Sequence, residues 1–345
     1  MAGLLDVDLA ARTAARLAPP GPQLSLGEAA DVVVQLRDLT GEAEQHVRDV
    51  TGLHGVVGPA TVVDRPDWAR ANAEGFAVVL APLQETLGAR QGRVGAAVTS
   101  RVSGVQVGSM LAWLSSKVLG QYEAFQPAGQ AGRLLLVAPN IVETERRLGV
   151  DPHDFRLWVA LHEVTHRTQF TAVDWLHDHV RSEIGALLKA AGLDDPQALV
   201  ERLKAIAGGP RGGSLVELLQ TPEQRVVMDR VTAFMSLLEG HAEHVMDGVG
   251  PSVVPTVGHI RQRFDERRRE RGGPLDRLLR RLLGLDLKAQ QYAEGSRFVA
   301  HCVEAVGMSG FNRVWESPAQ LPTRAEITDP AGWVARVHGG LAGTG

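Results

Sequence analysis

The chain has 345 residues, of which 44% are hydrophobic and 22% are charged, a globular composition that excludes a disordered or fibrous protein. The net charge of -4 gives no general attraction to nucleic acid, and no apolar run approaches the roughly 18 residues of a membrane span. The single cysteine, Cys302, excludes an intramolecular disulfide and a cysteine-rich zinc site. We therefore expect a cytoplasmic protein that binds neither nucleic acid nor membrane.

Helical periodicity dominates the first third of the chain. Asp6–Leu17 is predicted to form an amphipathic helix that ends at a proline-rich segment. Ser25 and Glu28 have the spacing of a capping box, which opens a long helix. Asp67–Thr86 predicts another helix, and the weakly polar stretch Val94–Gly120, rich in small residues, predicts one or two buried helices.

The middle of the chain gives the clearest strand. Arg133–Val137 is short, apolar and bounded by glycine and proline, so it predicts a strand and is the candidate edge for a substrate peptide. Asn140 is expected to cap a short helix, with Glu143 at the capping-box position. Pro152 occupies the first position of a further helix that runs to about Phe170.

The rest of the chain is predicted to be helical, which makes the fold class mainly α with a small β-sheet (α+β). We expect one domain over residues 1–345, with a division into a helical part (1–130) and a site-bearing part (131–345) as the alternative. Further helices are predicted at residues 175–191, 195–206, 221–247, 258–271, 274–283, 286–306 and 309–316.

The strongest chemical signal is the H-E-x-x-H motif of His162, Glu163 and His166. Residues four apart share one face of a helix, so both imidazoles can bind one zinc ion. Glu163 lies one step round the helix, where it can activate a zinc-bound water. The alternative is a pair of exposed histidines with a salt-bridged glutamate, but the apolar sequence before the motif favours a buried site.

A catalytic zinc site needs a third protein ligand. The metzincin extension is absent, because Gln169 stands where glycine belongs and Ala172 where the third histidine belongs. His177 and His179 follow closely, but they are expected to be ordinary polar positions of the next helix. A later helix is the better source of the third ligand.

The segment Leu238–Asp247 supplies the candidates, because acids and imidazoles crowd into an otherwise apolar helix. We predict Glu239 as the third ligand and keep His241 and Glu243 as alternatives. Glu243 shares a face with Glu239 and is expected to orient a ligating histidine through a hydrogen bond. Gly240 would let the two metal-binding helices approach closely. The alternative for the whole segment is an exposed Glu/His face.

The combination of H-E-V-T-H and the later E-G-H-A-E is the gluzincin arrangement. The sequence around both motifs, Val150–Phe170 and Ala233–Asp247, resembles the zinc-dependent metalloprotease family associated with biosynthesis of coenzyme F-420. The similarity extends over nearly the whole chain. It implies a zincin-like fold, in which the active-site helix packs on a second, ligand-bearing helix.

The resemblance also implies one zinc ion and the residues of its site. His162, His166 and Glu239 correspond to the metal ligands and Glu163 to the catalytic residue. Glu243 stands where such helices more usually carry an aspartate.

We accordingly expect a zinc-dependent hydrolase, a metallopeptidase, that acts on a peptide or amide substrate. Two alternatives stay open: a non-catalytic, zinc-stabilised helical scaffold that binds a partner, and an accessory protein of deazaflavin coenzyme metabolism. The sequence leaves the substrate, the oligomeric state and the group that stabilises the oxyanion open, and its only tyrosines are Tyr122 and Tyr292.

Overall fold

The computed structural model describes residues 5–88, 93–126, 132–190, 222–269 and 285–339. The predicted fold class is confirmed: the chain is mainly helical with a small mixed sheet. Two compact units can be distinguished, and both contain part of helix α6 (Pro152–Ala172). The helices predicted at residues 195–206 and 274–283 lie outside the described residues. The first unit comprises Met1–His46, Val56–Arg167 and Pro251–Arg263, and the second comprises Val47–Gly55, Thr168–Gly250 and Phe264–Gly345.

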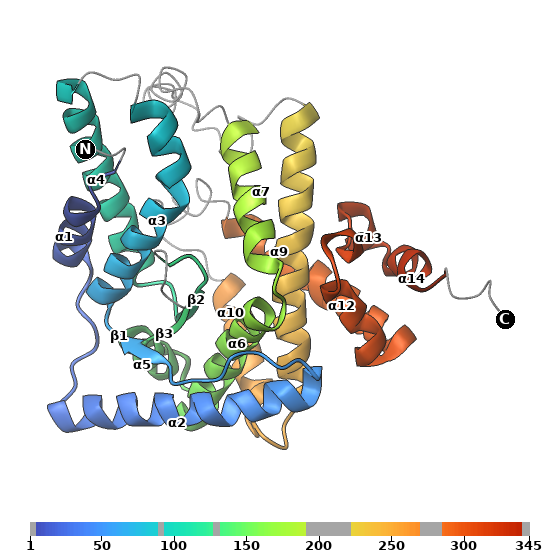
Figure 1. Cartoon of the computed structure of the whole chain (residues 1–345). Helices are drawn as coiled ribbons and strands as arrows, with labels where there is room; N and C mark the ends of the chain where they lie inside the picture. The colour runs from blue at the N-terminus through green and yellow to red at the C-terminus, as the bar shows by residue number, and fades with distance from the viewer. Residues whose placement is uncertain (1–4, 89–92, 127–131, 191–221, 270–284, 340–345) are drawn as a thin grey trace. The chain divides into compact units, whose positions relative to one another are not determined.

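Three helices of the first unit, α1 (Val7–Leu17), α3 (Arg65–Gly88) and α4 (Arg93–Leu114), pack against one another (Figure 1). The small residues of α4 allow this packing. A Cβ atom on Gly108 would lie 2.5 Å from the carbonyl oxygen of Ala10 on α1. The stretch predicted at residues 94–120 as one or two helices is a single helix, and it ends at Leu114, six residues before the predicted end.

The sheet of the first unit has three strands in the order β1 (Thr61–Val63), β3 (Arg133–Val137) and β2 (Gly120–Glu123). Strand β3 pairs in parallel with β1 and antiparallel with β2. The strand predicted at residues 133–137 is confirmed, but the prediction that it forms the edge is wrong. It lies in the centre because its run of apolar side chains is buried on both faces.

Alternation of side chains along the strands decides what each face of the sheet contacts. Leu135 and Val137 belong to the core formed with α1, α3 and α4. Because successive residues point to opposite faces, Leu136 and its partner Gly120 point the other way. On that side Glu163 of α6 lies directly against Gly120. The sheet thus supports the helix that carries the H-E-x-x-H motif.

Helix α2 (Leu26–Thr51) begins at the predicted capping box. The Ser25 hydroxyl accepts a hydrogen bond from the backbone N–H of Glu28 at 3.2 Å, and the Glu28 carboxylate accepts one from the backbone N–H of Ser25 at 2.7 Å. The pKa of the Glu28 carboxyl is lowered because its carboxylate accepts hydrogen bonds from the backbone N–H and the hydroxyl of Ser25. The capping-box prediction for α2 is confirmed.

Helix α5 (Ala138–Leu148) contradicts the second capping prediction. Asn140 lies inside this helix, and no side chain caps its first turn. The Asn140 side-chain amide instead donates to the carbonyl oxygens of Ser115 and Val118, both at 2.6 Å, and its oxygen accepts from Nε of Arg65 at 2.7 Å. The residue is buried because it connects three separate segments.

The second unit consists of helices around an aromatic core. The predicted boundary after residue 306 is confirmed by Gly307, which has a φ of 72° and interrupts α12. Among its described residues, the unit contains α7 (Leu176–Ala190), α9 (Pro222–Val249), α12 (Leu285–Phe311), the short 3-10 helices η1 (Asn312–Trp315) and η2 (Pro318–Gln320), α13 (Arg324–Thr328) and α14 (Pro330–His338). Their core includes Phe298, Phe311, Trp315 and Trp333.

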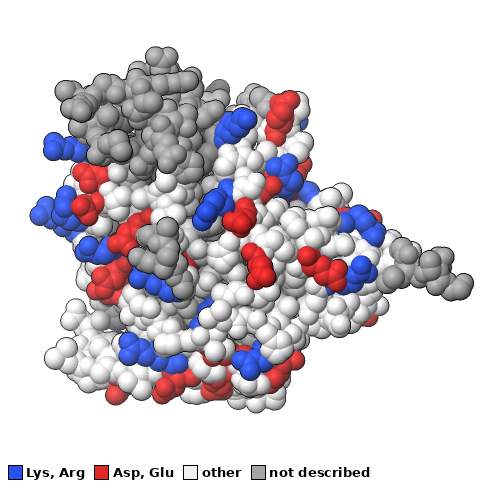
Figure 2. Space-filling view, in the orientation of Figure 1, with Lys and Arg blue, Asp and Glu red and all other residues white. Residues whose placement is uncertain are grey.

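Helix α10 (Val257–Arg269) is shared between the units, because the division falls after Arg263. Within the described residues, no helix has the length and apolarity to cross a membrane. Figure 2 shows basic and acidic side chains interspersed over one face, with no large area of a single sign among the described residues.

Candidate metal centre

The motif helix α6 starts as its sequence predicts. Asp151 accepts a hydrogen bond from the backbone N–H of Asp154 at 3.0 Å, and Pro152 is the first helical residue. The following turns are apolar, and Phe155, Leu157 and Leu161 are fully buried. This burial holds the helix inside the protein, while His162 and His166 of the motif are only half-buried.

The two histidines of the motif have the separation that a shared metal ion requires. The Nε2 atoms of His162 and His166 lie 3.2 Å apart, and the rings are perpendicular, at 89°. Two nitrogens bound to one tetrahedral zinc ion at about 2.0–2.1 Å lie about 3.3 Å from each other. The side chains are therefore already arranged as a two-nitrogen zinc site.

Glu239 of α9 completes the group. One ligand atom from each of His162, His166 and Glu239 lies within 4.8 Å of the other two. Glu239 is 7% exposed, and a buried carboxylate requires a compensating positive charge or hydrogen bonds. Two imidazoles and one carboxylate form a donor set that suits zinc, so the residues fit the ion.

The contact that joins α6 to α9 lies within the second unit, because Thr168–Ala172 of α6 belongs to that unit. The side-chain amide of Gln169 donates one hydrogen bond to the carbonyl oxygen of Leu238 and one to Nδ1 of His241, both at 3.0 Å. Since α6 is one continuous helix, this contact also fixes His166, which lies less than one turn earlier.

His241, an alternative for the third ligand, is not part of the ligand group. Its imidazole is fully buried, stacks on Phe311 with ring centroids 5.6 Å apart and an angle of 27°, and meets Trp315 edge-on at 5.4 Å. Glu243 is one turn beyond Glu239 and also lies outside the group of ligand atoms. Its predicted role in orienting a ligating histidine stays a prediction.

Gly240 allows a close approach, but the predicted partner is wrong. A Cβ atom at this position would lie 2.1 Å from the carbonyl carbon of Gly295, which belongs to α12. In turn, a Cβ atom on Gly295 would lie 1.9 Å from the carbonyl oxygen of Ser236. The glycine pair brings α9 against α12 rather than against α6.

Glu163 is 7% exposed and does not belong to the group of metal-binding atoms. It is turned toward strand β2: a Cβ atom on Gly120 would lie 2.5 Å from Cγ of Glu163 and 3.0 Å from its Oε1. The missing side chain of Gly120 therefore leaves the space that the glutamate occupies. Sequence patterns do not predict this strand, because Gly120–Glu123 is short and polar.

Tyr122 follows on the same face of β2, since residues two apart in a strand point to the same side. Burial raises the pKa of its hydroxyl, and the positive charge of Arg167 opposes the shift. The Tyr122 hydroxyl is thus protonated at neutral pH and can donate a hydrogen bond. The side chain of Tyr292, the other tyrosine, lies outside the described residues.

His177 and His179 pack against aromatic rings. His177 meets the ring of Phe170 at 5.4 Å, and His179 lies between Trp175 and Phe234 at 5.6 and 5.5 Å. Burial lowers the pKa of both imidazoles. Neither residue belongs to a potential ligand group among the described residues.

A second group of potential ligands, Asp151, His153 and Asp154, lies at the start of α6. Its carboxylates already have structural roles. Asp151 caps the helix, and Asp154 accepts hydrogen bonds from the backbone N–H and the hydroxyl of Thr256 at 2.8 and 2.7 Å. These bonds explain why the acids lie together.

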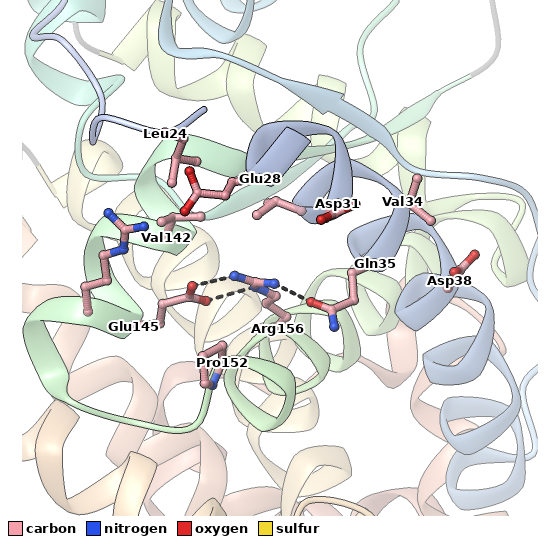
Figure 3. A pocket seen from close by; sticks show the side chains of 12 residues that line it. Leu24, Glu28, Asp31, Val34, Gln35, Asp38, Val142, Glu145, Pro152 and Arg156 are labelled. Atoms are coloured by element: carbon pink, nitrogen blue, oxygen red, sulfur yellow. Dashed lines mark hydrogen bonds and ion pairs between the residues drawn. The ribbon is translucent and has the colours of Figure 1, made fainter. Parts of the chain in front are cut away.

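The first unit also contains a pocket of about 560 Å³ between α2, α5 and the first turn of α6 (Figure 3). Arg156 donates to both carboxylate oxygens of Glu145, at 2.9 and 2.5 Å, and also to the side chain of Gln35. Burial raises the pKa of Glu145, and Arg156 opposes the shift. None of the described residues lining the pocket is a histidine, cysteine or serine, so the metal centre remains the better candidate for chemistry.

Comparison with known proteins decides the family. The sequence profile of the zincin-like metallopeptidases matches residues 5–334, almost the entire chain. The chain belongs to this family. The predicted zincin-like fold is thereby confirmed, and family membership implies zinc as the metal of the site.

The zincin-like protein also resembles a solved structure, a crystal structure of a candidate hydrolase with a novel fold from Chloroflexus aurantiacus. The two sequences are 32% identical, the TM-score is 0.68, and the match covers 99% of this chain and 100% of the other. No curated protein matches the sequence. The association with coenzyme F-420 biosynthesis stays a prediction.

Proposed function

We propose that this zincin-like protein is a zinc-dependent hydrolase, a metallopeptidase, with His162, His166 and Glu239 as the zinc ligands and Glu163 as the general base. The observation that carries the proposal is the convergence of the three ligand side chains, with the two Nε2 atoms 3.2 Å apart. The solved structure with 32% identity, described as a candidate hydrolase, supports the same class of reaction.

Zinc bound by this donor set would polarise the carbonyl of a peptide or amide and make a water molecule more acidic. The protein side chains then have separate tasks. His162 and His166 stay neutral to present nitrogen lone pairs, and Glu239 supplies the one negative charge of the ligand set.

Glu163 would act on protons. Its carboxylate would accept a proton from the attacking water. It would afterwards donate this proton to the leaving nitrogen, so that the product departs as a neutral amine. Its position favours this role, because it adjoins His162 in sequence, is nearly buried and lies against Gly120. A nearly buried carboxylate exchanges protons with a reactant more readily than with bulk water.

The number of ligands favours an enzyme over a zinc-stabilised scaffold. Structural zinc sites have four protein ligands, whereas catalytic sites have three and keep one position for water or substrate. Within the part of the chain that the structure describes, the ligand group contains three residues.

The test separates metal binding from turnover. Purified protein is assayed for zinc by mass spectrometry of the metal and for cleavage of a mixed pool of synthetic peptides. We expect one zinc per chain, loss of zinc in Glu239→Ala, and full zinc but no cleavage in Glu163→Gln. Glu304→Gln, an exposed carboxylate on α12, is the matched control and should behave as the wild type.

Two results would contradict the proposal. Absence of bound zinc in the wild-type protein would contradict the proposed zinc site. Cleavage by Glu163→Gln at the wild-type rate would remove the assigned base.

A further inference from the structure

We propose that Gln169 is a positioning residue of the metal centre: its side-chain amide ties α6 to α9 and thereby holds Glu239 at the distance from the two histidines that zinc requires. This inference rests on the proposed function, because it assigns a role to a residue beside the proposed ligands. It concerns Gln169, which has no place in the H-E-x-x-H motif itself.

The place of Gln169 on α6 is the first part of the argument. His162, His166 and Gln169 are spaced by four and three residues, so they lie along one face of the helix. The rise of 1.5 Å per residue puts Gln169 about 4.5 Å beyond His166 along the axis. A bond from Gln169 to α9 therefore acts within one turn of the ligand atoms.

The partners on α9 are equally close to the third ligand. Gln169 donates to the carbonyl oxygen of Leu238, the residue directly before Glu239, and to Nδ1 of His241, two residues after it. One amide thus forms hydrogen bonds to α9 on both sides of Glu239. Both bonds are 3.0 Å long, and all three residues are buried.

The chemistry of the amide fixes the direction of both bonds. The Leu238 carbonyl can only accept, so the Gln169 nitrogen must face it. That nitrogen carries two hydrogens and no lone pair for accepting, so Nδ1 of His241 must accept the second bond. Glutamine is the residue that supplies two donors from one atom here, and glutamate of the same shape supplies none.

His241 is itself held rigidly. Its ring stacks on Phe311 at an angle of 27° and meets Trp315 edge-on, and it is fully buried. The amide of Gln169 is therefore bonded to a ring packed among aromatic side chains and to the backbone of α9. These two bonds set the separation of the metal-binding helices next to Glu239.

The test compares Gln169→Met with a matched control, Gln224→Met. Gln224 is also a buried glutamine of the second unit, and it donates to the carbonyl oxygen of Ala190, but it lies at the start of α9, four turns before Glu239. Both variants lose a side-chain bond to a backbone carbonyl and keep an unbranched side chain. We measure zinc affinity by competition with a chromogenic chelator, and the d–d spectrum of the cobalt-substituted protein.

For Gln169→Met we expect zinc affinity to fall about tenfold or more, as is typical when a residue that holds a metal site in place is lost, together with a shifted cobalt spectrum. Gln224→Met should show neither change. The double variant Gln169→Met/His241→Leu removes the unsatisfied ring nitrogen, so its melting temperature should recover toward that of the wild type while its zinc affinity stays low.

The outcomes separate this inference from the proposed function. Wild-type zinc affinity and an unchanged cobalt spectrum in Gln169→Met would overturn the positioning role while leaving the metal centre intact. Recovery of zinc affinity in the double variant would overturn it too, because the defect would then come from the unsatisfied nitrogen. Failure of the wild type to bind zinc would instead contradict the proposed function.

Discussion

Replacement of Gly240 by alanine tests the packing that carries the third ligand. The new Cβ atom would lie 2.1 Å from the carbonyl carbon and 2.4 Å from the carbonyl oxygen of Gly295, whereas ordinary contact begins near 3.4 Å. The backbones of α9 and α12 would have to separate by about 1.3 Å, the difference between 3.4 and 2.1 Å, since no side chain can rotate away.

Two opposing effects set the magnitude of this change. Alanine is favoured over glycine inside a helix by about 1 kcal/mol, and overpacking of a tight contact costs about 1–3 kcal/mol or more. Because the contact at Gly240 joins backbone to backbone, we expect the larger cost, a net loss of about 1–2 kcal/mol. The melting temperature should fall by about 2–5 °C.

Gly185→Ala provides the control of opposite sign. Gly185 lies in the middle of α7, is exposed and has nothing within 4 Å of an added Cβ atom. This variant gains the helix preference without a clash, so its melting temperature should rise by about 1–3 °C. Thermal unfolding followed by circular dichroism measures both. A melting temperature for Gly240→Ala that rises as for Gly185→Ala would refute the close helix crossing.

Three further predictions concern the site and its surroundings. Gly120→Ala pushes a Cβ atom against Glu163, so we expect peptide cleavage to fall about 100-fold at unchanged zinc content. Gly41→Ala, which has open space around its new Cβ atom, should match the wild type. Cleavage by Gly120→Ala at the rate of Gly41→Ala would argue against the contact with Glu163. Removal of zinc with a chelator should lower the melting temperature, since zinc at 100 times its Kd stabilises by about 2.7 kcal/mol, and His166→Ala should be insensitive to the chelator. Burial raises the pKa of Cys302 to about 12, so a disulfide reagent at pH 8 should modify it only after denaturation; rapid modification of the native protein would contradict its burial.

Local signals in the sequence predict local structure well in this chain. The capping box of Ser25 and Glu28 is confirmed, and so is the start of α6 at Pro152. Both depend on groups within one helical turn, so the sequence contains all that decides them. The spacing of His162 and His166 is of the same kind, and their Nε2 atoms do converge.

Features that depend on distant residues are predicted poorly. Asn140 has the local pattern of a helix cap, but Arg65, 75 residues earlier, and two backbone carbonyls bind its side chain instead. Strand β2 (Gly120–Glu123) has no apolar run from which it could be predicted. The face that it turns toward the motif helix carries a glycine and a tyrosine. In both cases the partner is known only once the fold is known.

The helix that carries Glu239 shows which features can be predicted from the sequence and which cannot. An acidic residue in an otherwise apolar helix singles out Glu239, and its carboxylate does lie near the two histidines, although its role as a ligand stays a prediction. The glycine beside it correctly indicates close backbone contact, but a missing Cβ atom does not say which helix fills the space. Gly295 fills it, and its own sequence surroundings give no indication of that pairing.

The residue at position 169 reflects where the third ligand comes from. In the metzincin pattern the third histidine follows on the same segment, so the chain must turn sharply, and a glycine at this position permits the turn. Here α6 continues as a helix to Ala172, and the proposed third ligand, Glu239, belongs to another helix, 73 residues after His166. Such a ligand needs a bond between helices rather than a turn within one. Gln169, with its two donors on α9, supplies that bond at the position that the metzincins give to glycine.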